Sequence, residues 1–203
     1  MKRRWLEFWS RAKASGDAEA PWARLSARYA EPQRASHTIA HIAHCLEEFG
    51  GARDLAADPL AVEMALWYHD AVYDPRRHDN EEKSAELAAA DARLLGLAAS
   101  FGDRVADLIR TSTHRALAED PDAKLFSDID LAILGRPVDV FDEYERKVRV
   151  EYAWVPEPAF RAGRSAILRS FLERPSIYAT EHFRAKYEAP ARDNLARSIR
   201  RLA

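Results

Sequence analysis

The chain has 203 residues and a formal net charge of −2. Hydrophobic residues make up 47% of it and charged residues 32%, which is typical of a folded globular protein and excludes an intrinsically disordered one. Because the charge is nearly balanced, composition gives no reason to expect nucleic acid as a partner. The one cysteine, Cys45, excludes an intrachain disulfide and fits a reducing compartment.

The first residues, MKRRWLEFWSRAK, contain no apolar run long enough for a signal peptide, and no later stretch approaches the roughly 20 apolar residues of a membrane span. We therefore expect a cytoplasmic protein with no membrane partner.

Helix is the predicted conformation throughout, because the chain has only seven glycines and is rich in Ala, Leu, Arg and Glu. No stretch shows the sustained alternation of a strand. We predict an all-α fold of about ten helices in a single domain over 1–203, with its core at about 22–172 and the terminal helices packed on it. Proline, glycine and capping residues place the helices at about 2–14, 22–29, 34–49, 59–73, 79–96, 103–113, 123–134, 137–154 and 156–172, followed by two pieces that Pro175 and Pro190 bracket.

Three histidines of the predicted helix 34–49 have the spacing i, i+4, i+7. His37, His41 and His44 therefore fall on one helix face. Histidines in helices usually cap neighbours or pack their rings, and three on one face weaken that interpretation.

His69 and Asp70 interrupt AVEMALWYHDAVYD, the most apolar part of the predicted helix 59–73. A buried carboxylate is costly unless it is paired or binds a metal. A divalent cation accepts a neutral imidazole and a carboxylate together, so the doublet suggests a metal site.

Asp128 and Asp130 interrupt a second apolar run, KLFSDIDLAILG. Asp128 can act instead as a helix cap, so Asp130 is the preferred ligand and Asp128 the alternative. His114 ends the helix 103–113 beside a polar loop, where a histidine is usually a surface residue.

In this order, His37, His69-Asp70 and Asp128/Asp130 resemble the signature of the HD superfamily of metal-dependent phosphohydrolases. The segments YAEPQRASHTIAHI, WYHDAVYDP, DNEEKSAELA, FRAGRSAILRSFLERPSIY and EAPARDNLARSI are similar to a bacterial branch of predicted HD phosphohydrolases. The resemblance extends from about Trp22 to the end of the chain.

The resemblance implies an all-α HD-domain bundle that holds one divalent ion (Mn, Fe, Co, Ni, Zn or Mg). The ligands that it implies are His37, His69, Asp70, and Asp130 or Asp128. A second metal near His114 is an alternative, because binuclear members of the superfamily carry further histidines between the His-Asp doublet and the last aspartate ligand. Such an ion polarises a phosphoryl group and lowers the pKa of water.

The predicted function is hydrolysis of a small phosphorylated substrate, plausibly a nucleotide, in a protein that can form a homodimer. The catalytic candidates are Asp70, Glu82 and Glu81, and the substrate-binding candidates are Arg34, Lys83, His114, Arg161 and Arg164. Two alternatives are an HD-fold di-iron oxygenase, which needs the second metal, and a helical binding module whose metal is purely structural.

Overall fold

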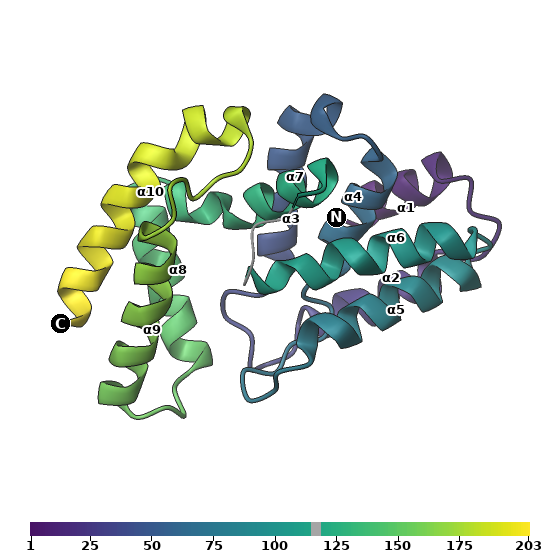
Figure 1. Ribbon diagram of the computed structural model, residues 1–203. Helices are drawn as coiled ribbons and strands as arrows, with labels where there is room; N and C mark the ends of the chain where they lie inside the picture. The colour runs from purple at the N-terminus through teal and green to yellow at the C-terminus, as the bar shows by residue number, and fades with distance from the viewer. Residues whose placement is uncertain (115–118) are drawn as a thin grey trace. The chain divides into compact units, whose positions relative to one another are not determined.

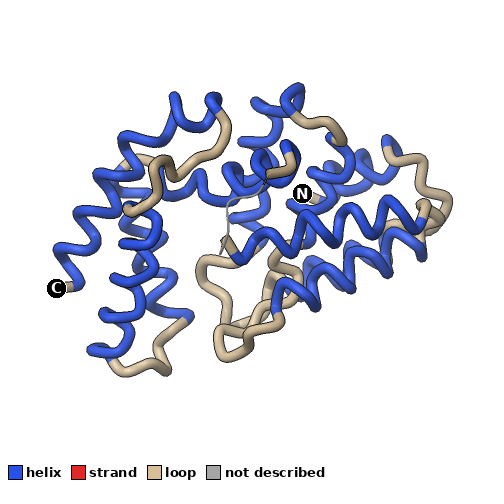
Figure 2. The backbone as a smooth tube through the Cα atoms, in the orientation of Figure 1, coloured by secondary structure: helices blue, strands red, loops and turns tan. Residues whose placement is uncertain are grey.

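The computed structural model describes residues 1–114 and 119–203, and in this part of the chain it contains helices and no strand (Figures 1 and 2). The predicted all-α fold of about ten helices is confirmed. The ten α-helices of the described residues are α1 (Lys2–Arg11), α2 (Glu19–Arg28), α3 (Ile39–Ala52), α4 (Pro59–Tyr68), α5 (Asn80–Leu94), α6 (Ala99–Arg110), α7 (Pro121–Asp130), α8 (Val138–Glu151), α9 (Glu157–Leu172) and α10 (Glu181–Leu202).

Contacts within the chain define two compact units, Met1–Ser127 and Asp128–Ala203. The expectation of one domain over 1–203 stays a prediction. None of the described helices combines the length and the apolar character that a membrane crossing requires.

The first unit is built around α4, in which every residue from Ala61 to Tyr68 is buried. Helices α3, α5 and α6 pack against it. On another side, the Trp5 ring of α1 meets the Trp67 ring edge-on, with 5.3 Å between centroids. Because α4 is apolar apart from Glu63, it needs neighbours on every face, and these neighbours fix the position of its last residues.

The second unit packs α8 and α10 against a short 3-10 helix, η3 (Leu131–Gly135), and α9 against α10. The Tyr178 hydroxyl donates to the Leu131 carbonyl at 3.0 Å, and the Asn194 amide donates to the Leu134 carbonyl at 2.9 Å. Gly135 faces the Tyr187 ring so closely that a Cβ would lie 2.6 Å from the Cβ of Tyr187. Only glycine allows this approach between η3 and α10.

Helix α3 begins later than the sequence predicts. Thr38 is its N-cap, and its hydroxyl accepts a hydrogen bond from the Ala40 main chain at 3.3 Å. His37 therefore precedes the helix. The prediction that His37 shares a helix face with His41 and His44 is wrong, because the side-chain cap stops the helix after His37.

Helix α4 ends at Tyr68, earlier than the predicted Tyr73, and His69 is its C-cap. The His69-Asp70 doublet therefore lies at the end of an apolar helix and not in its middle. The Trp67 carbonyl, in the last turn, accepts the Tyr29 hydroxyl at 2.9 Å, and the Ala71 amide donates to the Tyr68 carbonyl at 2.8 Å. These partners satisfy carbonyls that the helix end leaves open.

Pro190 does not divide the C-terminal segment as predicted, because it lies inside α10. Proline removes one main-chain hydrogen bond of a helix. Side chains on both sides of it, including Phe183 and Leu195, are buried against the second unit, and this packing keeps the helix continuous.

Candidate metal centre

The His69 imidazole has a fixed orientation at the end of α4. The residue is 2% exposed, and its Nδ1 lies 3.1 Å from the main-chain oxygen of Leu66, one turn back. A carbonyl oxygen only accepts hydrogen bonds, so Nδ1 is the donor. In the neutral ring, Nε2 then carries the lone pair, which is the arrangement of histidines that bind metals.

Two donor atoms of the first unit converge on this nitrogen. Nε2 of His41, on α3, lies 3.1 Å from Nε2 of His69. Oδ2 of Asp70 lies 3.2 Å from Nε2 of His69 and 3.6 Å from Nε2 of His41. Two imidazoles and a carboxylate thus point their donor atoms at one small volume.

These separations fit a common metal ion. Nitrogen and oxygen ligands bind zinc at about 2.0–2.2 Å, which places neighbouring ligand atoms roughly 3.0 Å apart at a right angle and roughly 3.4 Å apart at a tetrahedral angle. The observed 3.1–3.6 Å agree with these values. A mixed set of imidazole and carboxylate suits several divalent transition metals.

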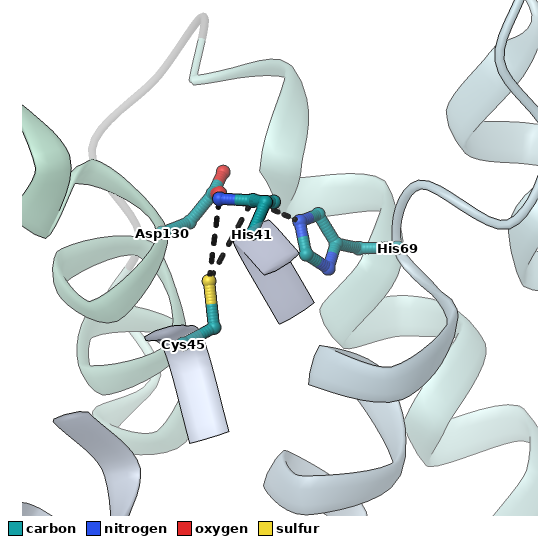
Figure 3. A group of neighbouring side chains, drawn as sticks. All are labelled: His41, Cys45, His69 and Asp130. Atoms are coloured by element: carbon teal, nitrogen blue, oxygen red, sulfur yellow. Dashed lines mark hydrogen bonds between the residues drawn. The ribbon is translucent and has the colours of Figure 1, made fainter. Parts of the chain in front are cut away.

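Cys45 and Asp130 form a second donor set with the two histidines, and Asp70 is not a member of that set. Cys45 lies one turn after His41 on α3, with its Sγ 3.5 Å from Nε2 of His41. Asp130 is the last residue of α7, the helix from which Phe126 contacts the His69 ring at 5.7 Å between centroids. One donor atom each of His41, Cys45, His69 and Asp130 lies within 4.8 Å of the others, so the group can hold a metal ion (Figure 3).

Positive charge nearby keeps the Asp70 carboxylate ionised. Burial alone would raise the pKa of Asp70, but the charges of His69 and His37, a hydrogen bond with His69 and the charge of His41 lower it far below its usual value. An ionised carboxylate beside imidazole nitrogens is the state in which this side chain binds a cation.

His37, the first ligand that the family resemblance implies, is not one of the converging side chains. Its ring stacks on the Tyr73 ring with 4.1 Å between centroids, and its centroid lies 6.3 Å from that of His41. His37 is therefore a neighbour of the donor group, and its role as a ligand stays a prediction.

Arg34, a predicted substrate-binding residue, links two segments of the site, and its role in substrate binding stays a prediction. Its side chain is 0% exposed. The guanidinium donates to the carbonyls of His37 at 3.0 Å, Asp70 at 2.6 Å and Ala71 at 3.2 Å. Arg34 thus connects the segment before α3 to the segment after α4. The guanidinium N–H groups that make these three bonds donate to main-chain oxygens.

Asp128 has a structural role in the second unit. Its Oδ1 accepts the Ala179 amide at 2.7 Å, and its Oδ2 accepts the amide and the hydroxyl of Thr180 at 2.7 and 2.6 Å. Thr180 is the N-cap of α10, so Asp128 anchors the start of that helix. Both carboxylate oxygens are occupied, which leaves Asp130 as the favoured ligand of the pair.

The other predicted site residues of the first unit have their own contacts. Glu82 accepts two hydrogen bonds from the Arg110 guanidinium, both at 2.8 Å, and Lys83 pairs with Glu86 at 2.8 Å. Glu81 is half-buried in the first turn of α5. Nδ1 of His114 lies 3.0 Å from the Ser127 hydroxyl. Their predicted roles remain predictions.

Arg161 and Arg164 both lie on α9, in the second unit. Arg161 is exposed and pairs with Glu157 at 2.9 Å. Arg164 is largely buried, where it pairs with Glu145 and donates to the Tyr144 hydroxyl at 3.2 Å. The predicted substrate-binding roles of both arginines stay predictions.

Sequence reasoning did not select His41 and Cys45 as ligands. His41 was noticed as a member of the histidine series, and Cys45 follows it by four residues, the spacing that places two side chains on one helix face. The i, i+4 spacing of His41 and Cys45 was the sequence signal that could have identified them as ligands.

Comparison with protein-family models, curated proteins and solved structures gives no match for this chain. The HD resemblance therefore remains a hypothesis from the sequence.

Proposed function

We propose that this protein is a metal-dependent phosphohydrolase that acts on a small phosphorylated molecule such as a nucleotide. The observation that carries the proposal is the convergence of His41, His69 and Asp70 at 3.1–3.6 Å, a spacing that fits one divalent cation. The sequence signature of the HD superfamily supports the choice of phosphate chemistry.

His41 and His69 would hold the cation, either with Asp70, which lies 3.2 and 3.6 Å from their nitrogens, or with Cys45 and Asp130. A bound divalent cation supplies a Lewis acid for a phosphoryl oxygen and lowers the pKa of water. Asp70 retains 18% exposure of its side chain, so water reaches it. An ionised carboxylate accepts hydrogen bonds, which would suit Asp70 to orient an attacking water.

The protein chain also stabilises this geometry. The Leu66 carbonyl fixes the His69 ring, and Arg34 holds the main chain of Asp70 in place. Groups that must bind a metal work best when neighbouring hydrogen bonds fix their orientation. The proposal therefore assigns Arg34 a positioning role.

The test combines elemental analysis of the purified protein with a phosphatase, phosphodiesterase and nucleotidase panel under Mn, Co, Ni, Zn and Mg. We expect about one divalent ion per chain and hydrolysis of at least one substrate, both lost in Asp70→Ala. His78→Ala, in an exposed turn, is the matched control and keeps both. A wild type that binds no metal and hydrolyses nothing contradicts the proposal.

A second candidate function has its own supporting observation. With Cys45, the group offers two imidazoles, a thiol and a carboxylate, and a closed set of four ligands is typical of structural zinc. If the metal is structural, chelation is expected to lower the melting temperature strongly, and no substrate of the panel is hydrolysed. Metal binding with hydrolysis supports the enzyme, and metal binding without it supports the structural site.

The di-iron oxygenase alternative depends on a second metal at His114. It predicts two irons per chain after expression in iron-rich medium, and the loss of one in His114→Ala. A single metal in both proteins excludes it.

A further inference from the structure

A charged hollow of about 360 Å³ lies in the first unit, on a part of the surface formed by α1, α4 and the 3-10 helix η1 (Arg53–Leu55). Such a volume is in the range of small-molecule sites. Every residue that lines it is ionisable: Arg3, Arg4, Glu7, Arg11, Arg53 and Glu63. The four arginines and two glutamates give the lining a net charge of +2.

A buried carboxylate organises two of these arginines. Glu63, on the otherwise apolar α4, is 1% exposed and accepts hydrogen bonds from Arg11 at 2.6 Å and from Arg53 at 2.6 Å. One negative charge thus fixes two guanidinium groups. The pair is preorganised, and it retains one excess positive charge at the wall of the hollow.

Arg4 adds a further positive charge, because its hydrogen-bond partner is a neutral main-chain oxygen. Its guanidinium donates to the Leu46 carbonyl. Burial and the charges of Arg11 and Arg53 lower the pKa of Arg4, although Glu63 and Glu47 act in the opposite direction. Burial is the main cause of the lowered pKa, and the Arg4 guanidinium supplies one of the four positive charges of the lining.

We propose that this hollow binds the phosphate group of a small phosphorylated molecule. Guanidinium groups present planar pairs of donors that match phosphate oxygens. The charge of −2 on a phosphate dianion balances the net charge of +2 on the lining. Glu7 and the exposed Arg3, which pair at 3.4 Å, form the rim. The site consists of residues other than the metal-binding candidates, so it does not depend on the proposed hydrolase activity.

The test is calorimetric titration of the full-length protein with inorganic phosphate, at constant ionic strength set with chloride. EDTA is present, so that phosphate cannot bind through a divalent metal. Glycerol 3-phosphate is titrated in parallel. We expect one saturable site, and tighter binding of the ester identifies an organic phosphate as the occupant, whereas equal binding identifies the phosphate group alone as the determinant.

Two variants change the lining charge in opposite directions. Arg4→Gln removes one positive charge and is expected to weaken phosphate binding about fivefold, the Coulomb effect of one charge on a dianion roughly 8 Å away in water. Glu7→Gln removes an exposed negative charge, threatens no buried contact, and is expected to tighten binding by a similar factor. Arg200→Gln, an exposed arginine of α10, is the control and leaves binding unchanged.

Circular dichroism and thermal melting confirm that each variant is folded before titration. The proposal is overturned if wild-type protein shows no saturable phosphate binding, or if Glu7→Gln and Arg4→Gln both bind phosphate like the control.

Discussion

Nδ1 of His69 donates a hydrogen bond to the main-chain oxygen of Leu66 at 3.1 Å, inside the last turn of α4. This contact decides which nitrogen of the ring faces His41 and Asp70. A lone pair on Nε2, 3.2 Å from a carboxylate oxygen, is stable only with a positive charge between or beside them. The charge can be a proton on an imidazole or a metal ion, and the two cases have different consequences for variants.

If a metal provides the charge, His69→Gln removes a ligand. We expect its affinity for zinc to fall by about 100-fold or more, since even the loss of an outer hydrogen bond to a metal ligand costs 10–100-fold. Competition with a chromogenic chelator measures this. His182→Gln, on the exposed side of α10, serves as the matched substitution and should bind like the wild type. Equal affinities in all three proteins would mean that His69 holds no metal.

The contact between Cys45 and His41 leads to a spectroscopic prediction. A thiolate bound to Co²⁺ gives an intense near-ultraviolet charge-transfer band, which nitrogen and oxygen ligands do not. If Cys45 is the soft ligand of the group, the cobalt-loaded protein shows this band and Cys45→Ser loses it. A wild-type spectrum without the band would place Cys45 outside the ligand set and weaken the structural-zinc alternative.

Arg34→Met separates a positioning role from a substrate-binding role. The substitution removes the donors to the carbonyls of His37, Asp70 and Ala71 in a buried place. We expect the free energy of unfolding to fall by about 2–4 kcal/mol, because unsatisfied buried groups cost about 1–3 kcal/mol each and some regain water. Urea denaturation measures it. Unchanged stability together with a raised KM would instead support the substrate-binding role.

Glu188 makes the second unit sensitive to acid. Burial alone would raise the pKa of Glu188, but main-chain hydrogen bonds from Ile177 and Tyr178, together with those from Arg192 and Ser176, lower it below its usual value. The folded-state pKa therefore lies below the unfolded value of about 4.3. The resulting stabilisation is complete above that unfolded pKa and is lost as the pH falls through the folded pKa.

We expect the stability of the wild type to decline below about pH 4.5 more steeply than that of Glu188→Gln. Denaturation midpoints between pH 3 and pH 6 give the comparison. Glu181→Gln, an exposed residue of α10, is the control and should follow the wild type. Parallel curves for all three proteins would remove Glu188 as the source of the acid sensitivity.

The sequence predicted most helices because their signals are local. The Pro59 start of α4, the acidic first turn of α5 and the end of α5 near Gly96, where φ is +80°, all depend on a few neighbouring residues. Propensity, capping and glycine conformation act within one turn, so one sequence suffices to read them.

The sequence also identified the unusual polar residues, although it could not assign their roles. His69, Asp70, Asp128 and Asp130 were recognisable because each interrupts an apolar run. Asp128 and Asp130 differ by two positions and have the same local surroundings. Asp128 anchors α10, whereas Asp130 belongs to the donor group. Only contacts with residues 50 positions away or more distinguish the two.

The sequence by itself determined that this chain is helical and that it carries imidazoles and carboxylates in apolar surroundings. Only the tertiary structure decided that His41 joins His69 and Asp70, that Cys45 lies beside them, and that Arg34 serves the main chain. The physical reason is that helix formation depends on neighbours along the chain, whereas a donor group is defined by distances of 3–4 Å between side chains that packing brings together.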